Sequence, residues 1–418
     1  MRTLLTTNEK AIDESLPETT ENHPTPTSID NPPPTLLELS ALFLRLGLTA
    51  FGGPAAHIAM MREEIVAKRK WIDEQEFLDL LGASNLIPGP SSTELAIHIG
   101  YRLGRGSGLV LAGVCFVLPA FLLVTLIAWA YVRFGRFPQI ASVLYGVKPV
   151  VIAIIVQALW NLRLTALKTR FLCALGGVAT LAALLSVNPL LVLFGAGGIA
   201  SGKFLVQKRE SGSVAPLLKL LGLIAVLIAA PLILDFRARS MGVSLNSLFW
   251  VFLKFGSIAY GSGYILLAFL RTDLVARLHW LTSAQLLDAT AVGQVTPGPV
   301  FTTATFIGYL LGGFPGAVVA TFGIFLPAFV FVAFSGSLLT GIRKSPLAGA
   351  FLDGVNVGSL ALMAAVSWEL ARSSVTDVLT ATLELTSLAL LIRFRTNSFW
   401  LIGGGAIAGL IATLGHKS

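Results

Sequence analysis

The sequence predicts an all-α polytopic membrane protein with two pseudo-symmetric, inverted repeats, each interrupted by a broken helix at a Pro-Gly-Pro motif. Of the 418 residues, 55% are hydrophobic and 12% are charged, and the mean hydropathy is +0.79. Soluble domains average about 25% charged residues. Several apolar stretches reach the ~20 residues that a membrane-spanning helix needs. Such continuous runs exclude a β-barrel, whose strands alternate apolar and polar residues.

An internal repeat is the second observation. The Pro-Gly-Pro motif at residues 88–90 recurs 209 residues later, at residues 297–299. The same offset pairs Arg45 with Lys254 and Glu64 with Asp273, and after the motif it becomes 208, pairing Trp160 with Trp368. One offset that holds over this span with a single gap indicates a duplication.

The Pro-Gly-Pro motifs predict breaks in the helices. Proline lacks the N–H and clashes with the preceding turn, and glycine frees the backbone. The segments at about 77–87 and 91–103 are each too short to span alone, so we expect re-entrant or broken helices. An odd number of crossings per half would invert the halves and bring both breaks together near the midplane. The loop charges do not decide that parity.

The chain divides into regions by composition. Residues 1–35 are polar and proline-rich, which predicts a disordered cytoplasmic tail. Each half then opens with an apolar helix that contains one cation, and continues through a glycine cluster and a charged connector. The connectors end near Trp71 and Trp280, which suit the membrane interface. The predicted regions are the tail 1–35, a first repeat 36–210, a linker and connecting helix 211–244, and a second repeat 245–418.

The charge and the cysteines exclude other classes of protein. The net charge is +8, but the basic residues are scattered in short loops, which is typical of positive-inside anchoring rather than nucleic-acid binding. Cys115 and Cys173 lie in apolar segments and are interpreted as small core residues. We therefore expect no disulfide, no metal site, no cofactor and no nucleic-acid partner.

The helix that restarts after each break predicts an anion site. Its first N–H groups are unpaired and its dipole is positive at that end. Hydroxyls follow each break, glycines let the backbone approach a ligand, and each half contains one intramembrane cation, which is a functional hypothesis by default. The cations could instead snorkel to the interface or pair with a carboxylate. The candidate substrate-binding residues are Arg45, Lys254, Gly89, Ser91, Ser92, Thr93, Gly298, Thr302 and Thr303.

The site is not symmetric. Glu94 and His98 stand four residues apart on one helix face, and the second half has no such pair. Histidine titrates near neutral pH, so the two residues are candidates for proton coupling. A structural hydrogen bond between helices is the alternative. A zinc site is not expected, because two ligands have no third nearby.

Other polar residues have secondary roles in this interpretation. Lys148 faces Asn356 in the repeat alignment and is a candidate for gating. Asp79 and Asp288 share a register and are expected to cap helices or pair with basic residues. His57 is interpreted as structural.

Several motifs resemble the chromate transporter family. They are Phe51-Gly52-Gly53-Pro54, the segment from Asn85 to Ile97, and the segment from Gly293 to Thr303. The chain is similar to the long, two-domain form of that family over about residues 36–415. The resemblance implies a multi-pass protein of the inner (plasma) membrane that transports chromate, an oxyanion close to sulfate in shape and charge. It also implies export and chromate resistance.

Three alternatives remain at this point. The substrate could be sulfate or another inorganic anion, carried by a transporter or an exchanger, and a channel would differ by passive conductance. A membrane-embedded enzyme could use Glu94, His98 and Ser92, but the second half keeps the break, the cation and the hydroxyls without Glu and His. Because the repeat duplicates the features that suit ligand binding and not the candidate catalytic residues, it favours a transporter over an enzyme. The expected partners are chromate or a sulfate-like anion, membrane lipid, and a second copy of the chain in a homodimer.

Overall fold

The computed structural model describes residues 34–51, 53–135, 138–207, 242–260, 265–343, 346–394 and 396–415. Within these residues all regular secondary structure is helical. Five of the helices are long and apolar enough to cross a membrane, which confirms the predicted polytopic all-α fold. Most of the predicted tail and of the predicted linker lies outside the described residues.

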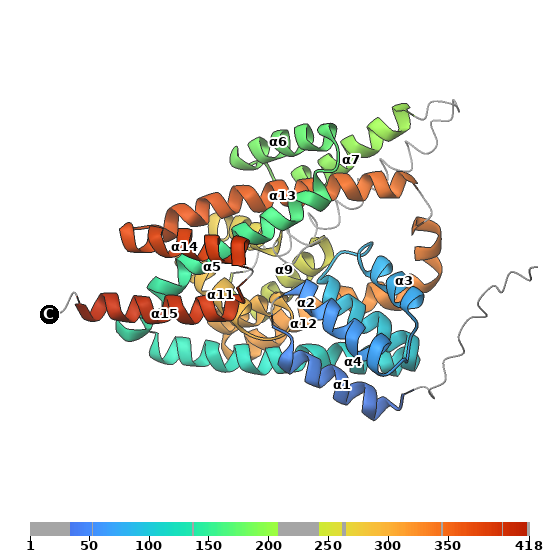
Figure 1. Ribbon diagram of the computed structural model, residues 1–418, viewed down its shortest axis with the longest axis horizontal. Helices are drawn as coiled ribbons and strands as arrows, with labels where there is room; N and C mark the ends of the chain where they lie inside the picture. Colours follow the sequence, from blue (N-terminus) through green and yellow to red (C-terminus); the bar gives the residue numbers. More distant parts are fainter. Residues whose placement is uncertain are drawn as a thin grey trace, which may run out of the picture.

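The helices of the two halves follow the same order (Figure 1), and the second half has one additional 3₁₀ turn before its long helix. The first half comprises α1 (Leu36–Thr49), α2 (Pro54–Arg62), the π-helical segment η1 (Glu63–Lys68), α3 (Glu74–Ser84), α4 (Ser91–Phe134), α5 (Pro138–Ala166), α6 (Arg170–Leu184) and α7 (Pro189–Gln207). The second half comprises α9 (Leu245–Ile258), α10 (Ile265–Leu270), the π-helical segment η2 (Arg271–Arg277), α11 (Ser283–Val295), the 3₁₀ turn η3 (Val300–Thr302), α12 (Thr303–Arg343), α13 (Pro346–Ser374), α14 (Val378–Phe394) and α15 (Ser398–Gly415).

Equivalent residues begin the first helix of each half. Thr35 caps α1 by accepting from the Glu38 N–H, and the Glu38 carboxylate accepts from the Thr35 N–H at 2.9 Å. Ser244 and Ser247 form the same reciprocal arrangement at the start of α9. Such a capping box satisfies two of the N–H groups that a helix start leaves unpaired, so local sequence sets where both repeats begin.

The long helix after the first break is a helical hairpin. Gly104 and Arg105 leave helical geometry, and Arg105 has a φ of 50°. A Cβ on Gly100 would lie only 2.3 Å from the carbonyl oxygen of Gly108. In a straight helix these residues would be about 12 Å apart. The segment before Gly104 therefore folds back on the longer helix as a re-entrant arm, as predicted for residues 91–103. The predicted break at Pro-Gly-Pro lies between the end of α3 and the start of α4.

The second half repeats this hairpin at equivalent positions. Gly312 and Gly313 leave helical geometry in α12, and a Cβ on Gly308 would lie 2.3 Å from the carbonyl oxygen of Gly316. Glycine is required at these crossings, because the two arms touch through their backbones.

Contacts between α4 and α12 show that the two halves are inverted. Gly113 of α4 lies against the ring of Phe329 of α12, and further along α4 the ring of Phe121 packs on Phe314, with centroids 6.4 Å apart. From residue 113 to residue 121 of α4, the contacting residue of α12 therefore changes from 329 to 314. The two equivalent helices run antiparallel, and two spanning helices that are antiparallel place their repeats in opposite orientations.

The last helices of each half pack on the other half. In Figure 1, α7 lies along α13, and α15 lies beside α5. Small residues allow close approach: a Cβ on Gly146 would lie 2.0 Å from the oxygen of Gly405, and one on Gly354 would lie 2.3 Å from that of Ala196. The repeats are therefore interlocked. The boundaries given for them in the sequence stay predictions.

The inverted arrangement can be tested by cysteine labelling. Ala67 in η1 and Ala276 in η2 occupy equivalent positions and are both exposed. In a background with Cys115 and Cys173 replaced by alanine, we expect Ala67→Cys and Ala276→Cys to react with an impermeant thiol reagent from opposite sides of the membrane. The cysteine-free parent is the control, and reaction of both variants from one side would contradict the inversion.

Candidate functional site

The two Pro-Gly-Pro breaks meet the opposite repeat. The Gly89 N–H donates to the carbonyl of Ala259 at 2.7 Å, and the Gly298 N–H donates to the carbonyl of Ala50 at 3.0 Å. Ala50 and Ala259 are the C-terminal caps of α1 and α9. Each break therefore satisfies a carbonyl at the end of the other half's first helix. This reciprocal pair of bonds brings the broken helices of both repeats together.

Glycine is needed at both break positions. Gly89 has a φ of 143° and Gly298 a φ of 94°, a region that other residues rarely adopt. A Cβ on Gly298 would also lie 2.8 Å from the Cβ of Ala120, and one on Gly89 would lie 2.3 Å from a carboxyl oxygen of Glu94. The backbone at the breaks has no space for a side chain.

His57 joins the starts of two helices. Its Nε2 lies 3.0 Å from the Ala50 carbonyl, and its Nδ1 lies 3.1 Å from the Ser92 hydroxyl. The neutral ring satisfies both contacts by donating from Nε2 and accepting at Nδ1. The N-terminal turns of α2 and α4 thus converge beside Ala50, and the positive ends of their helix dipoles suit an anion. The structural role expected for His57 agrees with this geometry.

The predicted hydroxyls differ in what they contact. The hydroxyls of Thr302 and Thr303 donate to the carbonyls of Pro299 and Val300, each at 2.8 Å. They stabilise their own turn, so their protons are not directed at a ligand. Ser91 begins α4. Thr93 lies in the first turn of α4 and is buried, and its hydroxyl oxygen has no hydrogen-bond partner in the described part of the chain.

Glu94 and His98 lie buried on the first arm of α4. Within the described residues, neither carboxyl oxygen of Glu94 and not the Nε2 of His98 has a hydrogen-bond partner. The structural hydrogen bond considered as the alternative is therefore not made by these atoms. A buried polar group without a partner is costly, so this pair stays a candidate for coupling.

The second-half cation is buried and paired. Lys254 is 4% exposed and forms an ion pair with Asp273. Arg277 also lies 3.2 Å from Asp273. Two cations thus surround one carboxylate: the Lys254–Asp273 pair is buried, and the Arg277 side chain is 25% exposed.

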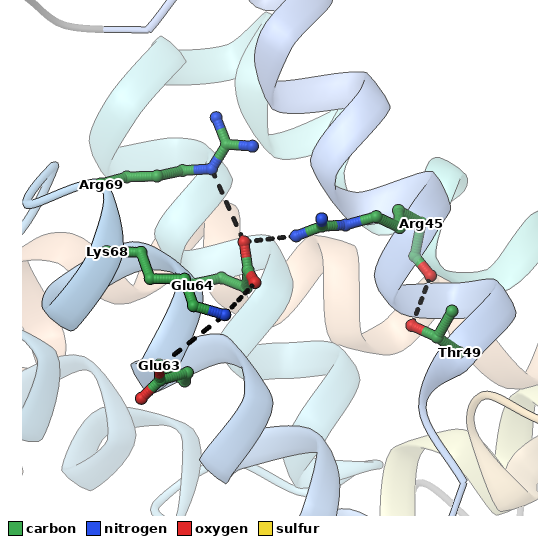
Figure 2. Close-up of polar contacts among 6 residues, drawn as sticks. All are labelled: Arg45, Thr49, Glu63, Glu64, Lys68 and Arg69. Carbon is green, nitrogen blue, oxygen red and sulfur yellow. Dashed lines mark hydrogen bonds and ion pairs between the residues drawn. The ribbon is translucent and has the colours of Figure 1, made fainter.

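The first-half cation is paired but open to solvent. The side chain of Arg45 is 53% exposed and forms an ion pair with Glu64, as Figure 2 shows. Lys68 and Arg69 reach the same carboxylate at 3.0 and 3.8 Å. Partial burial acts to raise the pKa of Glu64, but the hydrogen bond from Lys68 and the charge of Arg45 outweigh it, and the pKa lies below its usual value.

An open cavity of about 460 Å³ lies beside Arg45. Its lining residues come from α1, α2 and η1, and they are Arg45, Leu46, Thr49, Ala59, Met60, Glu63, Glu64 and Lys68. Arg45 stands five residues before Ala50 on α1, which corresponds to about 7.5 Å along a helix axis. The cavity therefore opens near the meeting point of the breaks.

Lys148 is part of a polar network that joins the two halves. Its Nζ lies 3.1 Å from Asp288 of α11, and the Tyr131 hydroxyl donates to the same carboxylate at 2.9 Å. The network links α4, α5 and α11, the helix that leads into the second break. This confirms the expected pairing of Asp288, and it leaves gating by Lys148 a prediction.

The described residues contain no group of three or more His, Cys, Asp or Glu side chains that could hold a metal ion. What the geometry offers instead is donors and cations: converging helix starts, a buried histidine and two cation clusters. Such a set suits an anionic ligand.

Comparison with known proteins agrees with this chemistry. The family model of the chromate transporter matches residues 37–201 and 246–410. The chain belongs to the chromate transporter family. It is 36% identical over 388 residues to a chromate transport protein of Cupriavidus metallidurans, covering 90% of this chain and 93% of that one. No solved structure matches it significantly.

Two further relatives of the transporter are informative. A chromate transport protein of Pseudomonas aeruginosa is 35% identical over 366 residues, covering 87% of this chain and 88% of that one. An uncharacterized transporter of Methanocaldococcus jannaschii is 27% identical over 341 residues, covering 80% and 84%. The relatives are named as transporters and not as enzymes, and the transporter described here is a multi-pass membrane protein.

The carboxylates that pair with the two cations are functional residues that the sequence motifs did not predict. Glu64 and Asp273 were recognised as repeat partners, without a role. A signal was present, because Arg45 and Glu64 are separated by the same 19 residues as Lys254 and Asp273. A cation and a carboxylate that recur at one spacing in both halves indicate an ion pair.

Proposed function

We propose that the protein is a secondary transporter that exports chromate across the inner membrane and thereby confers chromate resistance. The observation that supports this most strongly is the reciprocal contact of the two breaks, which together with His57 holds the start of α4 beside the end of α1, the helix that contains Arg45. Relatives named chromate transport proteins support the choice of anion.

The electrostatics favour outward transport of a dianion. Moving one charge across 100 mV changes its free energy by about 2.3 kcal/mol, so two negative charges gain about 4.6 kcal/mol on leaving an inside-negative cell. Export therefore needs no coupled ion, and the Glu94–His98 pair is not required to move a proton. In this proposal the dianion contacts Arg45 and the positive, N-terminal end of α4.

The proposal can be tested with everted membrane vesicles. A potassium diffusion potential that makes the vesicle interior positive should drive uptake of labelled chromate, and collapse of the potential should stop it. Arg45→Gln should lower the initial rate by about tenfold or more at equal protein in the membrane, because a dianion loses its countercharge. Chromate uptake no faster than in vesicles without the protein would contradict the proposal. Uptake of sulfate in preference to chromate would reassign the substrate.

A further inference from the structure

One carboxylate organises the open cavity of the first half. Glu64 contacts Arg45, Lys68 and Arg69, and Figure 2 marks all three contacts with dashed lines, the one to Arg69 through its Nε. The Glu64 side chain is 14% exposed, whereas those of Arg45 and Lys68 are 53% and 57% exposed. The carboxylate thus lies at the floor of the cavity, and the cations reach it from the solvent side.

The same set of charges recurs in the second half. The repeat offset pairs Arg45 with Lys254, Glu64 with Asp273, and Lys68 with Arg277. Both sets consist of a carboxylate in a π-helical segment, a cation from the half's first helix, and a cation four residues after the carboxylate. Both halves retain this set of charges, which is open to the cavity in the first half and largely buried in the second. Its presence in both places indicates a role other than anchoring the protein at one membrane surface.

The cations in the cavity suit an anion. Two cations, Arg45 and Lys68, and two carboxylates, Glu63 and Glu64, line it, so its charges balance while Glu64 is in place. Arg69, which also lies beside Glu38, reaches Glu64 from outside this lining. If Glu64 moved away, an anion could take its place beside Arg45 and Lys68. A cavity of about 460 Å³ is within the usual range for small ligands.

We propose that Glu64 is a resident anion, which occupies the first-half cation cluster in the empty transporter and is displaced when the substrate dianion binds. This inference rests on the proposed function, since it takes the transported dianion as the competitor. Displacement makes the empty site stable, because Arg45, Lys68 and Arg69 are never left without a negative partner. It also makes release fast, because the returning carboxylate competes with the bound anion.

Removal of the resident charge should separate binding from turnover. Without the competing carboxylate, the dianion should bind more tightly and dissociate more slowly. The affinity for the dianion then rises and the turnover rate falls. For Glu64→Gln in the vesicle assay we expect KM and kcat for chromate each to fall about fivefold or more. A merely structural role for Glu64 would instead raise KM or lower the amount of folded protein.

A matched control is available in the same half. Glu74 forms an exposed ion pair with Arg62, 2.7 Å away, and does not line the cavity. Glu74→Gln removes the same charge and should leave KM and kcat for chromate unchanged. If KM fell equally in Glu74→Gln, the effect would come from the net charge of the protein, and the inference would be overturned.

A second variant allows the charge to be restored in the same protein. In the background without native cysteines, Glu64→Cys should behave as Glu64→Gln does. Reaction with a sulfonate-bearing thiol reagent should return KM toward the parent value, and a neutral reagent should not. An unchanged KM in both variants, or equal effects of both reagents, would overturn the proposal. Loss of both variants from the membrane would show that Glu64 serves folding, and would overturn it as well.

The experiment distinguishes this inference from the proposed function. If the parent protein transports no chromate, the proposed function fails. If the parent transports chromate and the Glu64 variants keep its KM, only the role of Glu64 as a resident anion fails.

Discussion

Gly298→Ala is expected to abolish transport while the protein still inserts into the membrane. Gly298 has a φ of 94°, and an added Cβ would lie 2.8 Å from the Cβ of Ala120 on α4. Relief of that clash would move the break and weaken the bond from its N–H to Ala50. Strained backbone of this kind costs on the order of 1–3 kcal/mol. If this cost is added to the activation free energy of transport, the rate falls by about tenfold or more.

A double variant separates the two causes. Gly298→Ala combined with Ala120→Gly removes the clash and keeps the unfavourable φ, so we expect only part of the rate to return. Gly89→Ala should have a smaller effect, because its added Cβ would meet the end of the Glu94 side chain, which can rotate. Gly177→Ala in α6 is the control, since its Cβ would have no neighbour within 4 Å.

The measurement is the initial rate of chromate uptake, divided by the amount of protein in the membrane. Transport at the parent rate by Gly298→Ala would remove the second break from the transport site. Loss of the protein from the membrane, with normal activity of the remainder, would make the glycine a folding residue instead.

The large features of the fold were predictable because they follow from local sequence. The breaks arise from what Pro and Gly do to a helix, wherever they stand. The duplication follows from one offset, and the re-entrant arms follow from segments too short to span. The back-bonded hydroxyls of Thr302 and Thr303 could also have been foreseen, because Thr near a helix start often bonds to nearby carbonyls.

The rest depends on contacts between distant residues. No local pattern indicates that Gly89 would meet Ala259, or that α7 would pack on α13 rather than within its own half. The burial of Lys254 and the exposure of Arg45 also differ although their neighbours match, because exposure is decided by what packs over the ion pair. The sequence indicated the charged residues, and only the fold shows which of them a solute can reach.

That difference leads to opposite consequences when the two cations are replaced. In the sequence, Arg45 and Lys254 are repeat partners and equivalent candidates for substrate binding. In the structure Lys254 is 4% exposed and pairs with Asp273, whereas half of the Arg45 side chain is accessible.

Lys254→Met should therefore reduce the amount of folded protein. It leaves the buried carboxylate of Asp273 with Arg277 alone, and breaking a buried ion pair typically costs about 3–5 kcal/mol. Arg45→Met breaks an exposed pair, which is worth about 0–1 kcal/mol, so the variant should be present at parent levels and should fail to transport. The measurements are the monodisperse fraction in detergent, the midpoint of thermal unfolding, and chromate uptake.

Lys254→Met with Asp273→Asn should recover much of the folded protein, because removal of both charges leaves no unpaired buried carboxylate. Chromate uptake by this folded double variant then measures what the buried cation itself contributes to transport. If Lys254→Met alone unfolds at the parent temperature, the buried pair does not stabilise the protein. In that case the two cations are equivalent after all, and the asymmetry between an open and a closed cluster has no energetic consequence.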